Sequence, residues 1–247
     1  MNEQRIFKTP LAALGILLGA SFLVSSIIAA YAFYAVRTSD DALSVTGSAR
    51  QSVTSDQVKW TASLSRQVPV SSLRSGYDLL AQDLNRVMSF YAAHGIASTS
   101  LSISPISMDE MYDYRPGAEN REKEYNLRQT ISLSSADVQG VTAVAKDSSQ
   151  LARDGVIFRT DMLEYSYTKL PELRVSLLAD AIRDAKSRAE KLAEPSGQSV
   201  GALKAASLGV VQVLSKGSVD VSDYGAYDTS NIEKEVMVTV RASFRIR

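Results

Sequence analysis

The pattern of apolar and polar residues divides the chain into an uncharged opening segment and a long, regularly alternating remainder. Residues 9–36 contain no Asp, Glu, Lys, Arg or His, and most of them are apolar. At a helical rise of about 1.5 Å per residue, such a segment is long enough to cross roughly 30 Å of hydrocarbon. A helix satisfies its own backbone hydrogen bonds, so a single span needs no partner in the lipid. The pattern therefore predicts a membrane-spanning helix.

The same segment could instead be a secretory signal peptide that is removed after export. Arg5 and Lys8 supply the basic start of such a signal, and residues 30–32 form a small-x-small cleavage sequence. Signal peptides, however, use an apolar core of about 7–15 residues, and the apolar stretch before residue 30 is longer. Aromatic residues, which prefer the membrane interface, gather at the far end of the segment: Tyr31, Phe33 and Tyr34. We therefore expect an anchor that is not cleaved.

Charges on the two sides of the segment predict its direction. Basic residues precede it, whereas Asp40 and Asp41 follow it, and positive charge tends to stay on the cytoplasmic side. We expect a single-pass protein of the bacterial inner membrane with its main domain in the periplasm. The expected parts are a cytoplasmic N-terminus (1–8), a transmembrane anchor (9–36), a linker (37–41) and an exported domain (42–247).

The exported part has the alternation and spacing of a mixed α and β domain. Val58, Trp60 and Leu64 alternate with polar residues, which predicts a strand over residues 57–68 with one buried face. Between residues 71 and 94, apolar residues recur at spacings of three and four, as on one face of a helix. The same criteria predict strands over 42–49, 99–108, 122–134, 155–167 and 232–246, one or two strands within 200–214, and helices over 137–152 and 171–193.

The order of these elements repeats along the chain. Residues 57–134 and 155–246 both read strand, long helix, strand, polar loop, strand, although residue identity between them is low. We predict an α+β fold with two β-α-β-β halves, in which helices pack on mostly antiparallel sheets. The alternative is a chance likeness between two α+β segments.

Composition excludes several classes of function. Acidic and basic residues balance at 27 each, without the basic patch that binding to nucleic acid requires. Cysteine is absent, so the chain has neither disulfides nor a thiol nucleophile. The single histidine, His94, lies at the predicted end of a helix, where the helix dipole favours a cation, and one histidine does not make a usual zinc site. We expect no cofactor, no metal and no catalytic residue.

Carboxylates are the remaining candidates for chemistry. They cluster in two predicted loops: Asp109, Glu110 and Asp113 in one, and Asp220, Asp223 and Asp228 in the other. Neither loop has the ligand spacing of a calcium-binding hand. A paired-acid hydrolase would need two of these groups to converge. Polar loop tips are the simpler interpretation.

The same two loops contain tyrosine and methionine, which suit protein contacts. Tyrosine supplies a rigid, amphipathic contact area at a low cost in conformational entropy. We expect the loops to bind a second copy of the chain or an envelope protein, and the alternative is that they are connectors without a partner. The residues expected to take part are Met111, Tyr112, Asp113, Tyr114, Tyr224 and Tyr227.

Four short stretches follow one another in an order that is more specific than any one of them. They are residues 43–49 with Asp56; Gly95 and Ile96 with residues 101–103; residues 125–128 with Asp137 and Gly155; and the helix 179–193 with Gly197 and Gly201. In this order they resemble the SIMPL-domain family, a bacterial periplasmic and membrane-anchored group that includes outer-membrane immunogenic proteins. Ser48 and Ser55 stand where the family often has glycine and proline, which affects a turn and leaves the likeness intact.

The resemblance implies an α+β fold but no catalytic residues. Some members resemble builders of large ring-like homo-oligomers, and some are linked to envelope or oxidative stress defence. We therefore expect a protein that is not an enzyme and that acts in cell-envelope integrity or stress defence, as a homo-oligomer or with an envelope protein. The alternatives are a periplasmic module that binds a small ligand or peptidoglycan fragment and, third, a carboxylate-based hydrolase.

Overall fold

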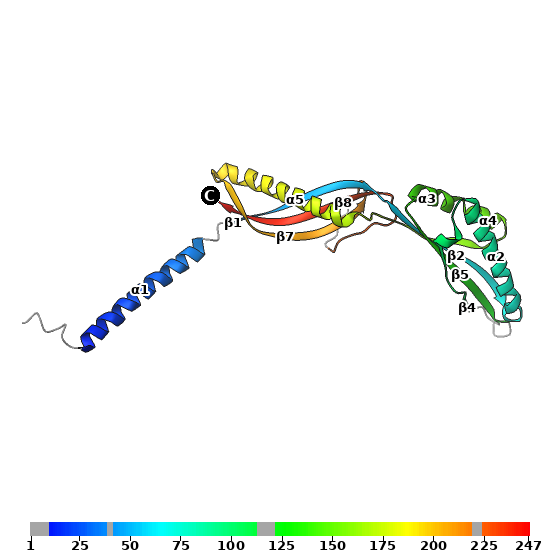
Figure 1. Cartoon of the computed structure of the whole chain (residues 1–247), viewed down its shortest axis with the longest axis horizontal. Helices are drawn as coiled ribbons and strands as arrows, with labels where there is room; N and C mark the ends of the chain where they lie inside the picture. The colour runs from blue at the N-terminus through cyan, green and yellow to red at the C-terminus, as the bar shows by residue number, and fades with distance from the viewer. Residues whose placement is uncertain (1–9, 39–41, 113–121, 219–223) are drawn as a thin grey trace, which may run out of the picture. The chain divides into compact units, whose positions relative to one another are not determined.

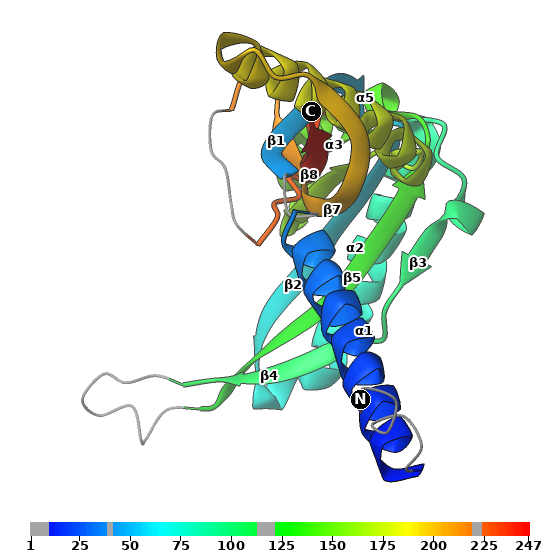
Figure 2. The ribbon, with the colours of Figure 1, turned by 90° about the vertical axis from the view of Figure 1, so that its left-hand side faces the viewer.

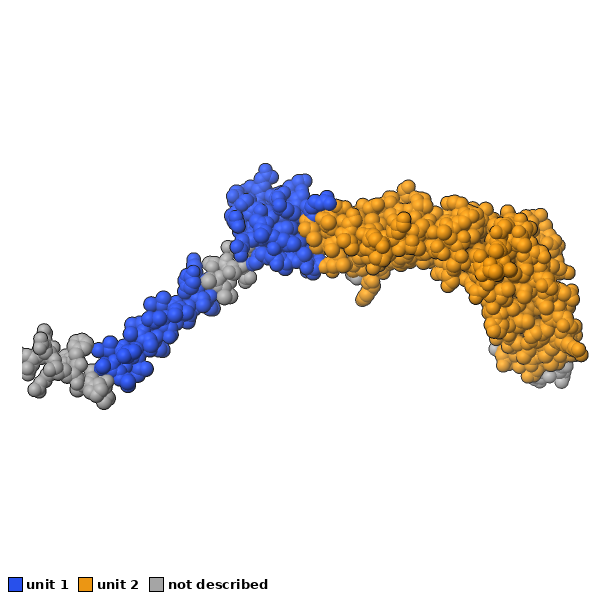
Figure 3. Space-filling view, in the orientation of Figure 1, with its two compact units in different colours: residues 1–47, 183–207, 241–247 blue, residues 48–182, 208–240 orange. Residues whose placement is uncertain are grey.

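The computed structural model of the chain describes residues 10–38, 42–112, 122–218 and 224–247. By their internal contacts, the described residues form two compact units, which Figure 3 colours separately. The first unit comprises Met1–Gly47, Arg183–Ser207 and Arg241–Arg247, and the second unit comprises Ser48–Ile182 and Leu208–Val240.

Helix α1 (Pro10–Thr38) confirms that the opening segment is helical (Figure 1). Its stretch Ala13–Tyr34 is long and apolar enough to cross a membrane. The most apolar part of this stretch is not buried against any other described residue. Both a membrane anchor and a signal sequence require a helix of this kind.

The second unit contains a sheet whose five strands, among the described residues, all pair antiparallel. The strands are β2 (Gln57–Pro69), β3 (Leu101–Ile103), β4 (Ser107–Met111), β5 (Glu124–Ser135) and β6 (Phe158–Ser166). Their order is β3-β5-β2-β6, and β4 also pairs with β5, beside which Figure 2 draws it. In the middle of the sheet, Trp60 of β2 lies between Leu133 of β5 and Leu163 of β6.

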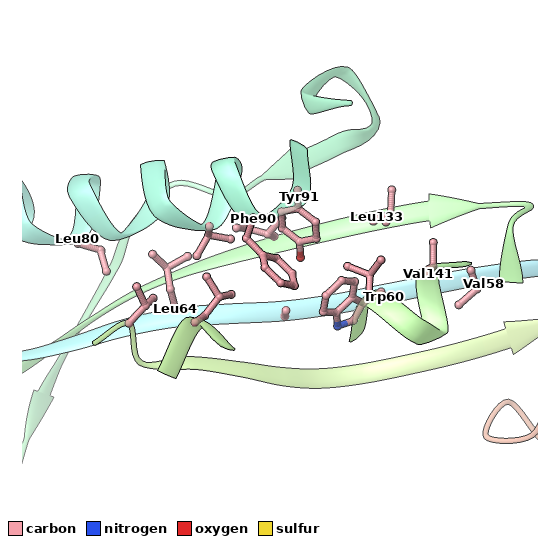
Figure 4. Close-up of a cluster of buried hydrophobic side chains, with 14 of the residues drawn as sticks. Val58, Trp60, Leu64, Leu80, Phe90, Tyr91, Leu133 and Val141 are labelled. Carbon is pink, nitrogen blue, oxygen red and sulfur yellow. The ribbon is translucent and has the colours of Figure 1, made fainter. Parts of the chain in front are cut away.

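Three helices of the described chain pack on the five-stranded sheet: α2 (Leu73–Ala93), α3 (Val138–Asp147) and α4 (Ser149–Arg153). The core lies between these helices and the apolar face of β2 and β5 (Figure 4). Trp60 and Tyr91 are each 1% exposed, and their rings meet edge to face with centroids 5.3 Å apart. α2 approaches the sheet closely at Gly76, where an added Cβ would lie 2.9 Å from Val68.

A three-stranded sheet contains β1 (Ala42–Thr54), β8 (Glu233–Ile246) and β7 (Val200–Ser215), in the order β1-β8-β7. Backbone bonds show that both pairings are antiparallel. Just before β8, the N–H of Ser55, which follows β1, donates to the carbonyl of Ile232. Just after β8, the N–H groups of Ser199 and Arg247 each donate to the carbonyl of the other residue, and Ser199 directly precedes β7. Both figures draw α5 (Leu170–Ala193) alongside this sheet (Figures 1 and 2). The buried side of α5 is rich in alanine: Leu170, Leu173, Leu177, Ala181, Ala185, Ala189 and Ala193.

The α+β class with antiparallel sheets is confirmed, but the strands do not divide between the sheets as the two sequence halves do. β6, the first strand of the second half, joins β2 in the five-stranded sheet. The place beside β8 is taken instead by β1, which precedes both halves.

Several boundaries also differ from the predicted ones. The strand expected over 99–108 is two strands, β3 and β4, separated at Pro105, which has no N–H to donate to a ladder. The helix expected over 137–152 divides into α3 and α4 at Ser148. Gly155, with a φ of +77°, follows the second of these helices, so β6 begins only at Phe158.

Candidate interaction surfaces

The first predicted interaction loop begins at the end of β4, where exposed apolar side chains gather. Met108 is 46% exposed, Met111 40% and Tyr112 72%. Asp113 and Tyr114 lie outside the described residues.

The strands and helix next to this loop are held to one another by polar contacts. Glu110 forms an ion pair of 2.9 Å with Lys123, and this hydrogen bond raises the pKa of Lys123. The N–H of Val70, just before α2, donates to the carbonyl of Lys123 at 2.9 Å, and the N–H of Ser71 donates to Glu122 at 2.6 Å. The Ser71 bond lowers the pKa of Glu122. Val70, Met108, Met111 and Tyr112 are therefore exposed at the same end of the five-stranded sheet, with Met108 and Met111 on its opposite faces, and we call this group the tip surface.

The second predicted loop differs from the first, because only one of its tyrosines is fully presented to solvent. Tyr224 is 98% exposed. Tyr227 is 43% exposed, but it also has structural contacts: its hydroxyl accepts a bond of 3.3 Å from the N–H of Tyr167, and its ring centroid is 5.9 Å from Nζ of Lys234. Its backbone also pairs with Val213 of β7. Tyr227 thus fastens its loop to the second unit.

The structure does not bring the two loops together. Met111 is paired with Glu124, and Glu124 with Pro69, which places the first loop at the end of β2. Tyr227 reaches Tyr167, next to Ser166, which pairs with Gln57 at the start of β2. β2 has 13 residues, so about 40 Å of strand separates the loops. They are two separate surfaces rather than one site.

Lys234 is a buried charge that sequence reasoning missed. Its side chain is 0% exposed, and its Nζ donates a hydrogen bond to the carbonyl of Asp228. Burial lowers the pKa of Lys234, and the nearby carboxylate of Asp228 opposes this effect in part. The signal was present in the sequence, because Lys234 has the same parity along β8 as the buried residues Val236, Val238 and Val240.

Asp228, one of the predicted loop carboxylates, has structural partners. Ser230 donates to Oδ1 through its N–H at 2.8 Å and its hydroxyl at 2.6 Å, and Asn231 donates to Oδ2 at 3.0 Å. Burial alone would raise the pKa of Asp228, but these bonds and the charge of Lys234 outweigh it and lower the pKa. Asp109 and Glu110 lie at the other end of β2, so the described carboxylates of the two loops do not converge.

A second buried charge, the carboxylate of Asp83 on α2, was also missed. Asp83 is 1% exposed and binds the guanidinium of Arg66 on β2 through both oxygens, one bond being 2.9 Å. The hydrogen bond that Arg66 donates to Asp83 raises the pKa of Arg66, and Arg86 approaches the same carboxylate at 3.3 Å. Asp83 is spaced three and four residues from the buried Leu80 and Val87, which could have indicated its burial. Within the described ranges, no group of three or more His, Asp or Glu could hold a metal ion.

A cavity of about 330 Å³ lies in the second unit between the end of α2 and the start of α3. His94 and Asp137 contribute polar groups to its wall, and Ile96 and Val144 contribute apolar ones. His94 follows α2 directly, as predicted, and its Nδ1 is 2.9 Å from the carbonyl of Phe90. Its Nε2 is 4.0 Å from Asp147. The wall of the cavity therefore combines apolar and polar groups, as the walls of small-molecule sites do.

Both sheets, the cavity and the two loops lie within the stretch of the chain that a known family model matches. The model is described as SIMPL, protein of unknown function (DUF541), and it covers residues 43–244. The chain belongs to the SIMPL family. The resemblance found in the sequence is confirmed, and α1 precedes the SIMPL domain. No curated protein matches the chain.

Proposed function

We propose that this SIMPL protein is a non-enzymatic, membrane-anchored protein of the bacterial periplasm, whose exported domain binds an envelope protein and a second copy of itself. Its role would be in cell-envelope integrity or stress defence. The observation that carries the proposal is the tip surface, in which methionine and tyrosine are exposed at one end of the five-stranded sheet.

The tip surface has the chemistry of a protein-binding surface. Methionine adapts its shape to a partner, and tyrosine combines an apolar ring with a polar hydroxyl. The surface is also rigid, because β4 pairs with β5 over its whole length and Val70 is tied to Lys123. A preorganised surface loses little entropy on binding, which favours affinity.

The proposed location follows from α1 and from the charges that flank it. Arg5 and Lys8 precede the helix, and Asp40 and Asp41 follow it, which favours a cytoplasmic N-terminus and a periplasmic domain. The length and apolar composition of α1 support an anchor.

The proposal that the protein is not an enzyme is supported by what its carboxylates do. Asp83 and Asp161 each contact two arginines, and Asp228 accepts bonds from Ser230 and Asn231. Burial would raise the pKa of Asp161, but the hydrogen bonds of Ser63 and Arg159 and the charge of Arg128 lower it. A carboxylate whose pKa is lowered, as those of Asp161 and Asp228 are, is a poor general acid.

The test of the tip surface is site-specific photo-crosslinking in intact cells. A photoreactive residue at Met111 should form adducts with an envelope protein that mass spectrometry then identifies. The matched control is Met162 on β6, which is 53% exposed but lies outside the tip surface. Equal adducts at both positions, or none at Met111, would contradict the proposal.

Self-association has a separate test. The mass of the solubilised full-length protein, measured by light scattering, should be a multiple of the 26.8 kDa chain. Deleting residues 109–118 should change this mass if the first loop takes part in assembly, and an unchanged mass would exclude that role.

The cavity beside His94 favours a second function, the binding of a small ligand or peptidoglycan fragment. Calorimetric titration with a soluble muropeptide should give saturable heat with the natural protein and a weaker response with His94→Ala. An identical response from both proteins would exclude this cavity as the site.

A further inference from the structure

The three-stranded sheet has open edges in the first unit. β1 and β7 flank β8, so each has one side along which no strand pairs in the described part of the first unit. Residues 202–207 of β7 are all exposed, which means that neither face of the strand is covered there. Such an edge presents N–H and C=O groups to which a further strand can bind.

These edges largely lack two of the features by which proteins usually block edge pairing, because they have no proline and little charge. Charged side chains, proline and bulges keep exposed edges apart in most sheets. Residues 202–207 contain a single charge, Lys204, and no proline. Residues 42–49 of β1 contain neither a charge nor a proline.

The other end of β7, in the second unit, is covered by the chain itself. The N–H of Val213 donates to the carbonyl of Ala226, and the N–H of Asp228 donates to the carbonyl of Val213, both at 2.8 Å. The chain therefore supplies a partner for one end of this strand, and residues 202–207 are the stretch left for another molecule.

We propose that residues 202–207 of β7 pair in parallel with residues 43–48 of β1 from a second copy of this chain. The proposal rests on the proposed function, because it names the surface through which the anchored protein would self-associate. Every copy carries both edges, so each β7 can receive the β1 of a neighbour.

The direction of the strands selects β1 as the partner. β1 and β7 are both antiparallel to β8, so they run in the same direction. Residues 39–41 alone separate α1 from β1, and β7 starts at the same end of the sheet, where Ser199 pairs with Arg247. In copies of the protein that are anchored in one bilayer, β1 runs away from the membrane in the same direction in every copy. Their edge strands therefore meet in parallel, as β7 with β1 does.

The size of the contact predicts that it needs the membrane. Six residues of strand edge bury far less than the ~1,200 Å² with which stable protein interfaces begin. When the α1 helices hold two copies in one membrane, the effective concentration of one strand edge near the other is higher. This higher concentration can offset the weak binding expected from a small contact area. We expect the pairing in the full-length protein in its membrane, and its loss when α1 is absent.

Side-chain alternation identifies the positions that should meet. The hydroxyls of Ser44 and Ser243 are 3.3 Å apart, and a Cβ at Gly201 would lie 3.7 Å from that of Arg245, so these residues share one face of the sheet. Counting in twos from Ser44 and Gly201 places Thr46 and Ala205 on this face and in the same row across the sheet. Ala206 lies on the opposite face.

The absence of cysteine from the chain makes disulfide mapping direct. The full-length double variant Thr46→Cys with Ala205→Cys, oxidised in native membranes, should give a ladder of dimers, trimers and larger species on a non-reducing gel. The matched control, Thr46→Cys with Ala206→Cys, places the second thiol on the wrong face and should lose the ladder. Dimers from Ala205→Cys alone would instead mean that two β7 strands meet, and would overturn the proposal.

A second variant tests the backbone pairing. The backbone N–H and C=O groups of Ser199 and Gly201 point toward β8. Because successive residues of a strand direct these groups to opposite sides, the N–H of Ala202 points to the open edge. Ala202→Pro, added to the first double variant, should abolish the ladder while the circular dichroism spectrum is retained. Amine crosslinking of the full-length protein in native membranes separates the two proposals: crosslinked oligomers without a disulfide ladder would overturn the β7 pairing and leave self-association standing, whereas a protein that stays monomeric in both assays would overturn both.

Discussion

The two sheets of this protein treat their edges in opposite ways. The five-stranded sheet ends at β6, which carries Arg159, Asp161 and Glu164 and whose pairing with β2 shifts register between Thr61 and Ala62. On its other side it ends in the short strands β3 and β4. The three-stranded sheet ends instead in β7, a strand of 16 residues with little charge. Charge and short strands discourage edge pairing, and a long edge with little charge invites it.

The difference indicates a division of labour within one SIMPL domain. The five-stranded sheet has a complete helical layer and a continuous apolar core, which are typical of a stable scaffold. The three-stranded sheet keeps a side open for another chain. The predictions that follow test this comparison, beginning with the largest expected effect.

The ion pair between α2 and β2 should be the most sensitive polar contact of the scaffold. Asp83→Ala leaves the guanidinium of Arg66 without its partner beneath α2, and breaking such a pair should lower the free energy of unfolding by about 3 kcal/mol. Urea denaturation followed by the fluorescence of Trp60, the single tryptophan, measures this change. The double variant Asp83→Leu with Arg66→Met should recover most of the stability. If the double variant is as unstable as the single one, the packing of α2 on β2 requires the ion pair itself and apolar residues cannot replace it.

The start of α3 should respond less strongly. The side chain of Asp137 accepts a hydrogen bond of 2.9 Å from the N–H of Gly140 and so caps the helix. Asp137→Ala should lower the free energy of unfolding by about 1 kcal/mol, whereas Asp137→Asn, which can still cap, should change it little. Equal losses in the two variants would argue that the charge rather than the cap stabilises α3.

The buried Lys234 should make the stability of the β8 region depend on pH. Because burial lowers the pKa of Lys234 in the folded protein, the unfolded chain binds more protons at pH values just below the ordinary lysine value of 10.5. Stability should therefore rise as the pH rises through this window, relative to a Lys234→Met variant. Burial raises the pKa of Tyr91, which has the opposite effect above pH 10, but that contribution is common to both proteins and cancels. Parallel curves for the two proteins would contradict the prediction.

The smallest change in stability should accompany a clear change in association. Leu203 of β7 is 45% exposed, so Leu203→Lys should alter the free energy of unfolding by no more than about 0.5 kcal/mol. The added charge should nevertheless weaken the disulfide ladder that the Thr46→Cys with Ala205→Cys protein forms in native membranes. Met162→Lys on β6, an edge that is already charged, serves as the control and should leave association unchanged. An equal effect at both positions would remove the distinction between the two sheets.

Much of the local structure was predictable, because periodicity reports the surroundings of each residue. The alternation around Trp60 predicted β2, and the spacing along residues 71–94 predicted α2. His94 was correctly placed at a helix end. The exposure of Met111, Tyr112 and Tyr224 agrees with the interaction surfaces expected from residue type, while their binding role stays a prediction.

Other features lay outside what periodicity can report. Tyr227 contacts Tyr167 and Lys234, and neither contact follows from residue type, while its expected place at an interface stays a prediction. Lys234 was missed because a charged residue is usually assigned to solvent, even at a position whose parity marks it as buried. The separation of the two loops followed only from the register of β2 with its neighbours.

The sequence by itself determined the helices and strands of this protein, its apolar opening helix and its membership of the SIMPL family, because each of these depends on the order and spacing of residues along the chain. The tertiary structure decided that β6 pairs with β2, that β1 pairs with β8, and that β7 keeps an open edge. The physical reason is that hydrogen bonds between strands join residues far apart in the sequence, and alternation tells a strand which face to bury but not which strand will lie beside it.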